Sequence, residues 1–324
     1  FNNTHKIIGK AVRSNMQGVF TDCPHREKLG WLEQVHLNGP GLFYNYDLRT
    51  FIPKIMQDIG DAQLPNGLIP NIAPEYVEFE GAFRDAPSWG SAGVIVPWMY
   101  YLYYGDLSLI KRYYHTMKKY VDYLSSKADN HIVSHGLGDW YDYTGERAGF
   151  SKNTPVALVA TAHYYGDIVL LSKAAQKIGN QKDEKHYLQL AEKVKNAYNA
   201  TFFNEQTNQY GTGSQCSNAI SLYFGFVDPQ KKSAVLDNLV TDIRKHGNRL
   251  TTGDVGTRYL FQTLANNGLS ELIYTMNNHE EVPGYGFQLK FGATTLTEQW
   301  DPRQGASWNH FMMGHIDEWF FAWL

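Results

Sequence analysis

The sequence has little cysteine, no long hydrophobic run and no strong excess of either charge. Its 324 residues include two cysteines, Cys23 and Cys216, which excludes a small fold held together by disulfides. The 29 Lys and Arg residues nearly balance 32 Asp and Glu, and the net charge of −3 argues against a nucleic-acid-binding protein. The most apolar stretch, residues 92–104, is too short for the roughly 18 residues that cross a bilayer and contains Pro97. We therefore expect neither nucleic acid nor membrane as a partner.

Metal ligands and phosphate-binding loops are also scarce. His131 and His135 are four residues apart but flank a glycine-containing loop, and no further ligand set accompanies them. No glycine-rich phosphate loop is present. The sequence therefore predicts no metal site and no cofactor.

Aromatic residues, by contrast, are abundant. They make up 15% of the chain, with 8 Trp, 22 Tyr and 17 Phe. Aromatic side chains fill protein cores, and they also stack on the apolar faces of sugar rings. Composition alone fits both uses.

Apolar residues recur every three or four positions along most of the chain, which predicts helices joined by short connections. Strand-like alternation is rare, and there is no long linker or low-complexity tract. Stacked helical hairpins form either an open superhelix or a closed toroid. The expected helices are residues 26–38, 46–61, 92–103, 107–127, 155–178, 183–199, 216–224, 229–245, 256–265, 269–277 and 307–323.

The segment 19–34 is dense in functional groups. A helix capped at Asp22 would place Glu27 and Trp31 on one face, because they are four residues apart. With Arg26 they could then converge on a pocket, where a carboxylic acid beside an indole ring would protonate a leaving group. The simpler interpretation is that Glu27 only favours the dipole of the helix.

A second dense segment, residues 292–310, contains Glu298, Trp300 and His310. Taken alone, Glu298 could be a surface carboxylate and His310 a core histidine. A closed toroid would still bring Glu27 and Glu298 across one cleft, although they are far apart in sequence. Two carboxyl groups flanking a glycosidic bond are what sugar hydrolysis requires.

Several ordered motifs resemble those of bacterial α-L-rhamnosidases of glycoside hydrolase family 78. The first signature is TDCPHREKLGW at residues 21–31, and the second is formed by GATT at 292–295, EQWD at 298–301 and SWNH at 307–310. Residues 89–98 and 138–140 also resemble family blocks. The resemblance spans nearly the whole chain and implies an all-α (α/α)6 barrel, a toroid of six helical hairpins.

The resemblance also implies roles for individual residues. Glu27 matches the general acid, and Glu298 matches the general base that activates water, so the reaction should invert the anomeric configuration. One departure concerns residues 33–34, Glu-Gln, where many members carry Gly-Asp. This change affects the expected polar contacts to one sugar hydroxyl. The residues implied to line the rhamnose subsite are Asp22, Arg26, Trp31, Trp89, Asp139, Trp140, Trp300 and His310.

We therefore expect residues 1–324 to form a single catalytic domain that removes terminal α-L-rhamnose from carbohydrate substrates. Family members usually carry flanking β-domains, so we expect this domain to come from a longer chain. Three alternatives remain at this point: a glucoamylase-like or trehalase-like (α/α)6 glycosidase, a catalytically silent sugar-binding domain, and an open helical interaction protein.

Overall fold

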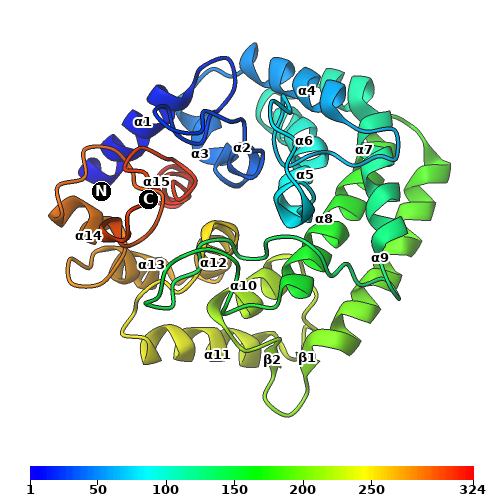
Figure 1. Ribbon diagram of the computed structural model, residues 1–324. Helices are drawn as coiled ribbons and strands as arrows, with labels where there is room; N and C mark the ends of the chain where they lie inside the picture. Colours follow the sequence, from blue (N-terminus) through cyan, green and yellow to red (C-terminus); the bar gives the residue numbers. More distant parts are fainter. The chain divides into compact units, whose positions relative to one another are not determined.

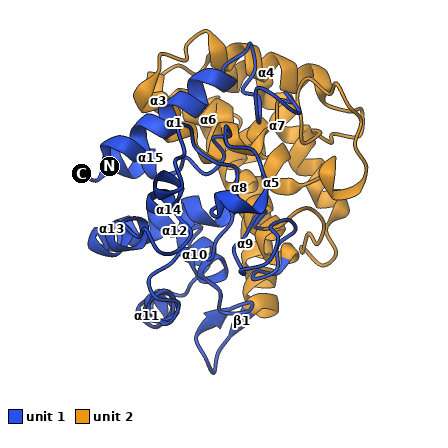
Figure 2. Cartoon of the chain, turned by 60° about the vertical axis from the view of Figure 1, so that its left-hand side comes forward, with its two compact units in different colours: residues 1–29, 139–155, 203–324 blue, residues 30–138, 156–202 orange.

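The computed structural model describes residues 1–324 and divides them into two compact units (Figure 2). Unit 1 consists of residues 1–29, 139–155 and 203–324, and unit 2 of residues 30–138 and 156–202. Both ends of the chain thus lie in unit 1. Most regular structure is helical, and no helix is long and apolar enough to cross a membrane.

Unit 2 is built from helices that pack on their neighbours in sequence. The long helices α6 and α7 pack together, as do α8 and α9 (Figure 1). The elements of unit 2 are α2 (Glu33–Leu37), α3 (Gly39–Asn45), α4 (Phe51–Ala62), the 3-10 helix η1 (Gly81–Phe83), α5 (Pro87–Gly90), α6 (Ala92–Tyr104), α7 (Ser108–Lys127), α8 (Val156–Lys177) and α9 (Gln181–Phe202).

Unit 1 joins the first helix of the chain to the last ones. Helix α12 is buried along most of its length and packs against α10, α13 and α15, while α1 packs against α14. The elements of unit 1 are α1 (Asn2–Asn15), β1 (Phe203–Asn204), β2 (Gln209–Tyr210), α10 (Gln215–Tyr223), α11 (Lys232–Lys245), α12 (Asp254–Asn266), α13 (Ser270–Asn277), α14 (Tyr285–Lys290), the 3-10 helix η2 (Pro302–Gln304) and α15 (Ile316–Ala322). The two strands form a short antiparallel hairpin.

The spacing of apolar residues correctly predicts where the long helices lie. In α7, the predicted stripe that includes Leu109, Tyr113, Met117 and Leu124 is buried. Burying one such stripe stabilises a helix that would be marginal alone. The predictions at residues 92–103, 155–178, 183–199, 216–224, 229–245, 256–265 and 269–277 are confirmed with small shifts at their ends, and the helix expected at 46–61 begins at Phe51.

Two predicted helices are wrong over most of their length. Of residues 26–38, only Glu33–Leu37 is helical before α3 begins at Gly39, and of residues 307–323 only Ile316–Ala322 is helical. In both places the backbone groups bond to other partners, as described below. The sequence analysis also missed α1, α3, α5 and α14.

Candidate active site

The segment that contains Glu27 is a closed loop. The Asp22 carboxylate accepts a hydrogen bond from the backbone N–H of Leu29 at 2.8 Å, and the N–H of Asp22 donates to the carbonyl of Leu29 at 2.9 Å. Lys28 has a φ of 59°, in the left-handed region that interrupts a right-handed helix. The shared helix face predicted for Glu27 and Trp31 is therefore wrong.

Arg26 connects the two predicted catalytic carboxylates. Its Nη2 lies 2.9 Å from Oε2 of Glu298 and 3.3 Å from Oε1 of Glu27. Because both oxygens contact the same nitrogen, they lie at most 6.2 Å apart, the sum of the two distances. The structure thus brings together two carboxylates that are far apart in sequence. This bound, which joins single oxygen atoms, is shorter than the roughly 6.5–9.5 Å between the carboxyl groups of inverting enzymes and longer than the roughly 5–5.5 Å of retaining ones.

Glu298 is buried and surrounded by hydrogen-bond donors. Besides Arg26, the backbone N–H of Ser307 donates to Oε2 at 2.7 Å and the hydroxyl of Tyr141 donates to Oε1 at 3.3 Å. Burial works to raise the pKa of Glu298, but three contributions outweigh burial and hold the pKa below its ordinary value: the charge that His310 carries when it is protonated at acidic pH, the Ser307 N–H and Arg26. Glu298 is therefore ionised at neutral pH.

The backbone of the second signature explains how Glu298 is held. The N–H of Glu298 donates to the carbonyl of Ser307 at 2.9 Å, and the N–H of His310 donates to the carbonyl of Leu296 at 3.0 Å. Residues 307–310 thus pair with 296–298 rather than with each other, which is why the predicted helix does not begin at Ser307.

His310 lies beside the charges of Glu298 and Asp22. Its Nδ1 accepts a hydrogen bond from the N–H of Met312 at 3.2 Å, so the neutral ring carries its proton on Nε2. Burial lowers the pKa of His310, although Glu298 and Asp22 work in the opposite direction. His310 is therefore a neutral donor at neutral pH, where Ser307 and Arg26 keep Glu298 ionised.

The loop that follows Gly138 supplies Tyr141. Asp139 is fully buried, and its Oδ1 accepts a hydrogen bond from the N–H of Gly256 in the first turn of α12 at 2.7 Å. The carbonyl of Trp140 accepts from the N–H of Asp254 at 2.9 Å. Asp139 thus anchors the loop to α12, and this geometry favours a positioning role for Asp139 over contact with a sugar.

The other predicted subsite residues have different surroundings. Trp300 is almost fully buried, and its Nε1 donates to the carbonyl of Thr252 at 2.8 Å, which favours a supporting role in the core. Trp31 and Trp89 belong to unit 2. Trp31 stacks on Phe79 with ring centroids 5.3 Å apart, and Trp89 is buried in α5. Their contact with a sugar stays a prediction.

Sequence reasoning missed two contacts of Glu298, those of Tyr141 and Ser307. Tyr141 follows the predicted residue Trp140, and Ser307 belongs to the second signature, but no spacing rule connects either of them to Glu298. Cys23 is a fully buried residue next to Asp22. Burial raises its pKa to about 11, the hydrogen bond to Asp22 adds to this, and the thiol is therefore not a reactive nucleophile.

The structure contains no group of three or more His, Cys, Asp or Glu side chains that could hold a metal ion.

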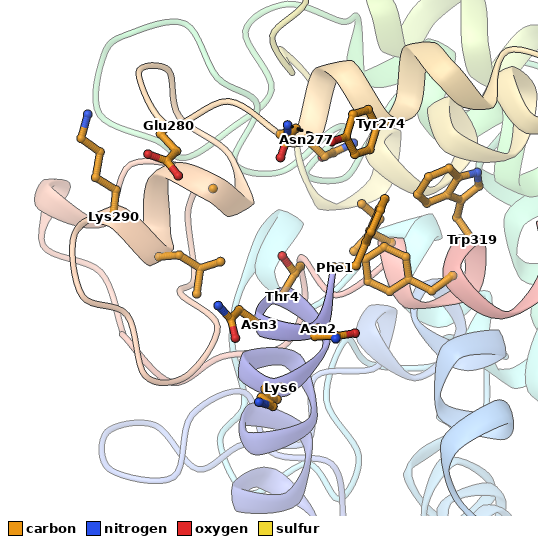
Figure 3. A pocket seen from close by; sticks show the side chains of 15 residues that line it. Phe1, Asn2, Asn3, Thr4, Lys6, Tyr274, Asn277, Glu280, Lys290 and Trp319 are labelled. Atoms are coloured by element: carbon orange, nitrogen blue, oxygen red, sulfur yellow. Dashed lines mark hydrogen bonds between the residues drawn. The ribbon is translucent and has the colours of Figure 1, made fainter. Parts of the chain in front are cut away.

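A cavity of about 750 Å³ lies elsewhere in unit 1, between the start of α1, α13, α14 and α15 (Figure 3). Phe1, Tyr274, Lys290 and Trp319 are among its lining residues, and none of the predicted site residues is.

The whole chain, residues 1–324, matches the family model described as the bacterial alpha-L-rhamnosidase 6 hairpin glycosidase domain. An alpha-L-rhamnosidase of Formosa agariphila is 29% identical over 332 residues, which cover 99% of this chain and 35% of that protein. The solved structure of alpha-L-rhamnosidase from Dictyoglumus thermophilum has 34% identity and a TM-score of 0.92, covering 99% of this chain and 36% of that chain.

A Streptomyces avermitilis alpha-L-rhamnosidase, solved in complex with L-rhamnose, has 27% identity and a TM-score of 0.90. That match covers 99% of this chain and 31% of the other. The chain thus spans about a third of the length of these relatives. The matches confirm the predicted all-α, six-hairpin fold and the resemblance from which it was inferred.

Proposed function

Because the chain belongs to the bacterial alpha-L-rhamnosidase six-hairpin glycosidase family, we propose that it removes terminal α-L-rhamnose from glycosides or polysaccharides. The reaction is hydrolysis by two carboxyl groups, and it needs no metal or cofactor. Glu27 is the general acid and Glu298 is the general base. We further propose that this is one catalytic domain of a longer chain, which the length of the relatives supports.

In the proposed mechanism, Glu298 takes a proton from a water molecule while that water attacks the anomeric carbon. Glu27 gives its proton to the glycosidic oxygen as the bond to the leaving group breaks. Water attacks the face opposite the leaving group, so the rhamnose released first is the β-anomer. Arg26 and the neutral His310 are positioned to bind sugar hydroxyls beside Glu298.

The observation that best supports this proposal is the state of Glu298. It is buried yet ionised, and Arg26 brings it within reach of a second, more exposed carboxylate. A base must be ionised to accept a proton, and an acid must exchange protons with solvent between turnovers. The two carboxyl groups meet these two requirements separately.

The experiment is an assay of p-nitrophenyl α-L-rhamnoside beside p-nitrophenyl α-D-glucoside. We expect hydrolysis of the rhamnoside alone, and preference for the glucoside would instead favour a glucoamylase-like enzyme. Proton NMR during the first minutes gives the stereochemistry. Initial β-rhamnose supports inversion, whereas initial α-rhamnose would show that Glu298 acts as a nucleophile.

A further inference from the structure

Helix α1 lies outside both signatures, yet it bonds to the two segments that carry the catalytic carboxylates. In its first half, the carbonyl of Ile7 accepts a hydrogen bond from the N–H of Leu296 at 3.1 Å. Leu296 is two residues before Glu298. At the end of α1, the side chain of Asn15 reaches both signatures at once, as described next.

Asn15, the last residue of α1, is fully buried and uses both ends of its side-chain amide. Its Oδ1 accepts a hydrogen bond from the hydroxyl of Thr21 at 2.7 Å, and its backbone carbonyl accepts from the N–H of Thr21 at 2.9 Å. Its Nδ2 donates to the carbonyl of Ala11 at 2.9 Å and to Oδ1 of Asn309 at 3.3 Å. One side chain therefore joins the start of the first signature to the end of the second.

On the side of the general acid, Asn15 holds the beginning of the loop that carries Glu27. Thr21 is buried and directly precedes Asp22, whose carboxylate closes this loop by accepting from the N–H of Leu29. The side chain of Glu27 is 40% exposed, so the backbone of the loop does much to determine its position. A shift at Thr21 would therefore move the general acid.

On the side of the general base, Asn15 holds the segment that bonds to Glu298. The side-chain oxygen of Asn309 accepts from Asn15 and also from the hydroxyl of Ser14 at 2.9 Å. The N–H of Asn309 donates to the hydroxyl of Ser307 at 3.0 Å, and the N–H of Ser307 donates to Oε2 of Glu298 at 2.7 Å. Two further hydrogen bonds thus lead from Asn309 to the base.

We propose that Asn15 is a positioning residue that sets the place of the general acid relative to the general base by joining their two segments. The inference rests on the proposed function and gives Asn15 no contact with the sugar. A buried polar network in which each member is bonded makes its surroundings rigid. Since a displacement of about 1 Å can cost about 10²-fold in rate, the loss of Asn15 should lower the rate while the groups that bind substrate remain.

The first experiment compares Asn15→Ala with Asn218→Ala as a matched control. Asn218 is also fully buried in unit 1 with both ends of its amide bonded: its Oδ1 accepts from the N–H of Tyr210 at 2.9 Å, and its Nδ2 donates to the carbonyl of Gly213 at 3.2 Å. We expect both substitutions to lower Tm, because each removes buried hydrogen bonds.

Only Asn15→Ala should also lower kcat for a rhamnosyl-glucose disaccharide, by about tenfold or more, with KM changed by less than about threefold. Kinetics are measured at a temperature at which both variants are folded. A wild-type kcat in Asn15→Ala, or an equal loss in Asn218→Ala, overturns the proposal. Activity of the wild-type chain means that the rhamnosidase function stands in either case.

The second experiment changes the partner of Asn15. Thr21→Val keeps the shape of the side chain but removes the hydroxyl that donates to Asn15, whereas Thr21→Ser keeps the hydroxyl. We expect Thr21→Val to lower kcat for the disaccharide by about fivefold and Thr21→Ser to remain near the wild type. Thr21→Val should add little to Asn15→Ala, because both changes break the same hydrogen bond. Fully additive losses would overturn the proposal.

Amide hydrogen exchange tests the connection without catalysis. In Asn15→Ala, the N–H groups of residues 20–29 should exchange faster than in the wild type, whereas Asn218→Ala should leave them unchanged. If the wild-type chain hydrolyses no rhamnoside, the proposed function fails, and exchange alone decides about Asn15. Unchanged exchange of residues 20–29 in Asn15→Ala would overturn its role.

Discussion

The two segments that carry the catalytic carboxylates differ in how firmly they hold them. The side chain of Glu298 is 9% exposed, between paired backbone segments and three hydrogen-bond donors, whereas that of Glu27 is 40% exposed, in the loop closed by Asp22 and Leu29. Identical groups in different surroundings can take opposite roles in proton transfer. Glu298, which is buried and ionised, suits the role of a base. Glu27, which is exposed, suits the role of an acid that must regain its proton from solvent after each turnover.

Replacing the base should have the largest effect. Glu298→Gln keeps the shape of the side chain but cannot accept a proton, so we expect kcat to fall by about 10³-fold or more. The loss should be similar for p-nitrophenyl α-L-rhamnoside and for a rhamnosyl-glucose disaccharide, because both need an activated water. Steady-state kinetics on both substrates make the measurement.

Glu281→Gln is the control for this change. Glu281 is a highly exposed glutamate that pairs with Lys290 and lies outside the proposed site, so its loss should not alter kcat. A Glu298→Gln enzyme within tenfold of the wild type would remove Glu298 from the role of base.

Replacing the acid should have an effect that depends on the leaving group. Glu27→Gln should lower kcat/KM for the disaccharide by about 10²-fold or more, because a sugar alkoxide needs a proton to leave. For the p-nitrophenyl substrate we expect less than about tenfold, since p-nitrophenolate leaves without one. Kinetics on both substrates test this, and equal losses would contradict the division of roles between the two carboxyl groups.

The long helices could be predicted from the sequence because burial of an apolar stripe determines them. The period of α7 is visible in Leu109, Met117 and Leu124, and the structure buries these side chains. The same rule failed at the site. No local pattern reveals that Asp22 bonds to the backbone of Leu29, and the sequence around Asp22 is equally typical of a helix cap.

The site also depends on contacts between residues far apart in the chain. Tyr141 meets Glu298 across 157 positions of sequence, and Ser307 pairs with Glu298 through backbone groups that carry no side-chain signature. The roles of the two glutamates were therefore inferred from resemblance to a family, and their surroundings required coordinates. Local periodicity indicates which face of a helix is buried, but it does not indicate which loops contact each other.

Removing one hydrogen-bond donor to Glu298 should change the activity less than replacing either carboxyl group. Tyr141→Phe deletes the hydroxyl that donates to Oε1 at 3.3 Å. A lost donor raises the pKa of a carboxylate, so the acidic limb of the kcat profile should move to higher pH, with kcat about five- to tenfold lower.

Measuring kcat from pH 3.5 to 8 determines the position of the acidic limb. Tyr274→Phe is the control, because Tyr274 is exposed and its hydroxyl contacts only Asn278 among hydrogen-bond partners in the structure. A reduced kcat with an unmoved acidic limb would mean that Tyr141 shapes the site without tuning Glu298.

The smallest effect that we predict concerns Asp139, behind Tyr141. Burial, with the charge of Asp142 added, raises the pKa of Asp139 to about 7. Because the carboxyl binds its proton more tightly in the folded state, its contribution to stability is present below about pH 4 and is lost as pH rises through 7. Asp139→Asn keeps an oxygen for the Gly256 N–H and removes the buried charge. Its Tm should therefore rise by a few degrees relative to the wild type between pH 4 and pH 7. Thermal unfolding at pH 4, 5.5 and 7 measures this difference, with the exposed Asp237→Asn as control. A difference that stays constant with pH would show that Asp139 is ionised throughout, and that hydrogen bonds alone anchor the loop behind Glu298.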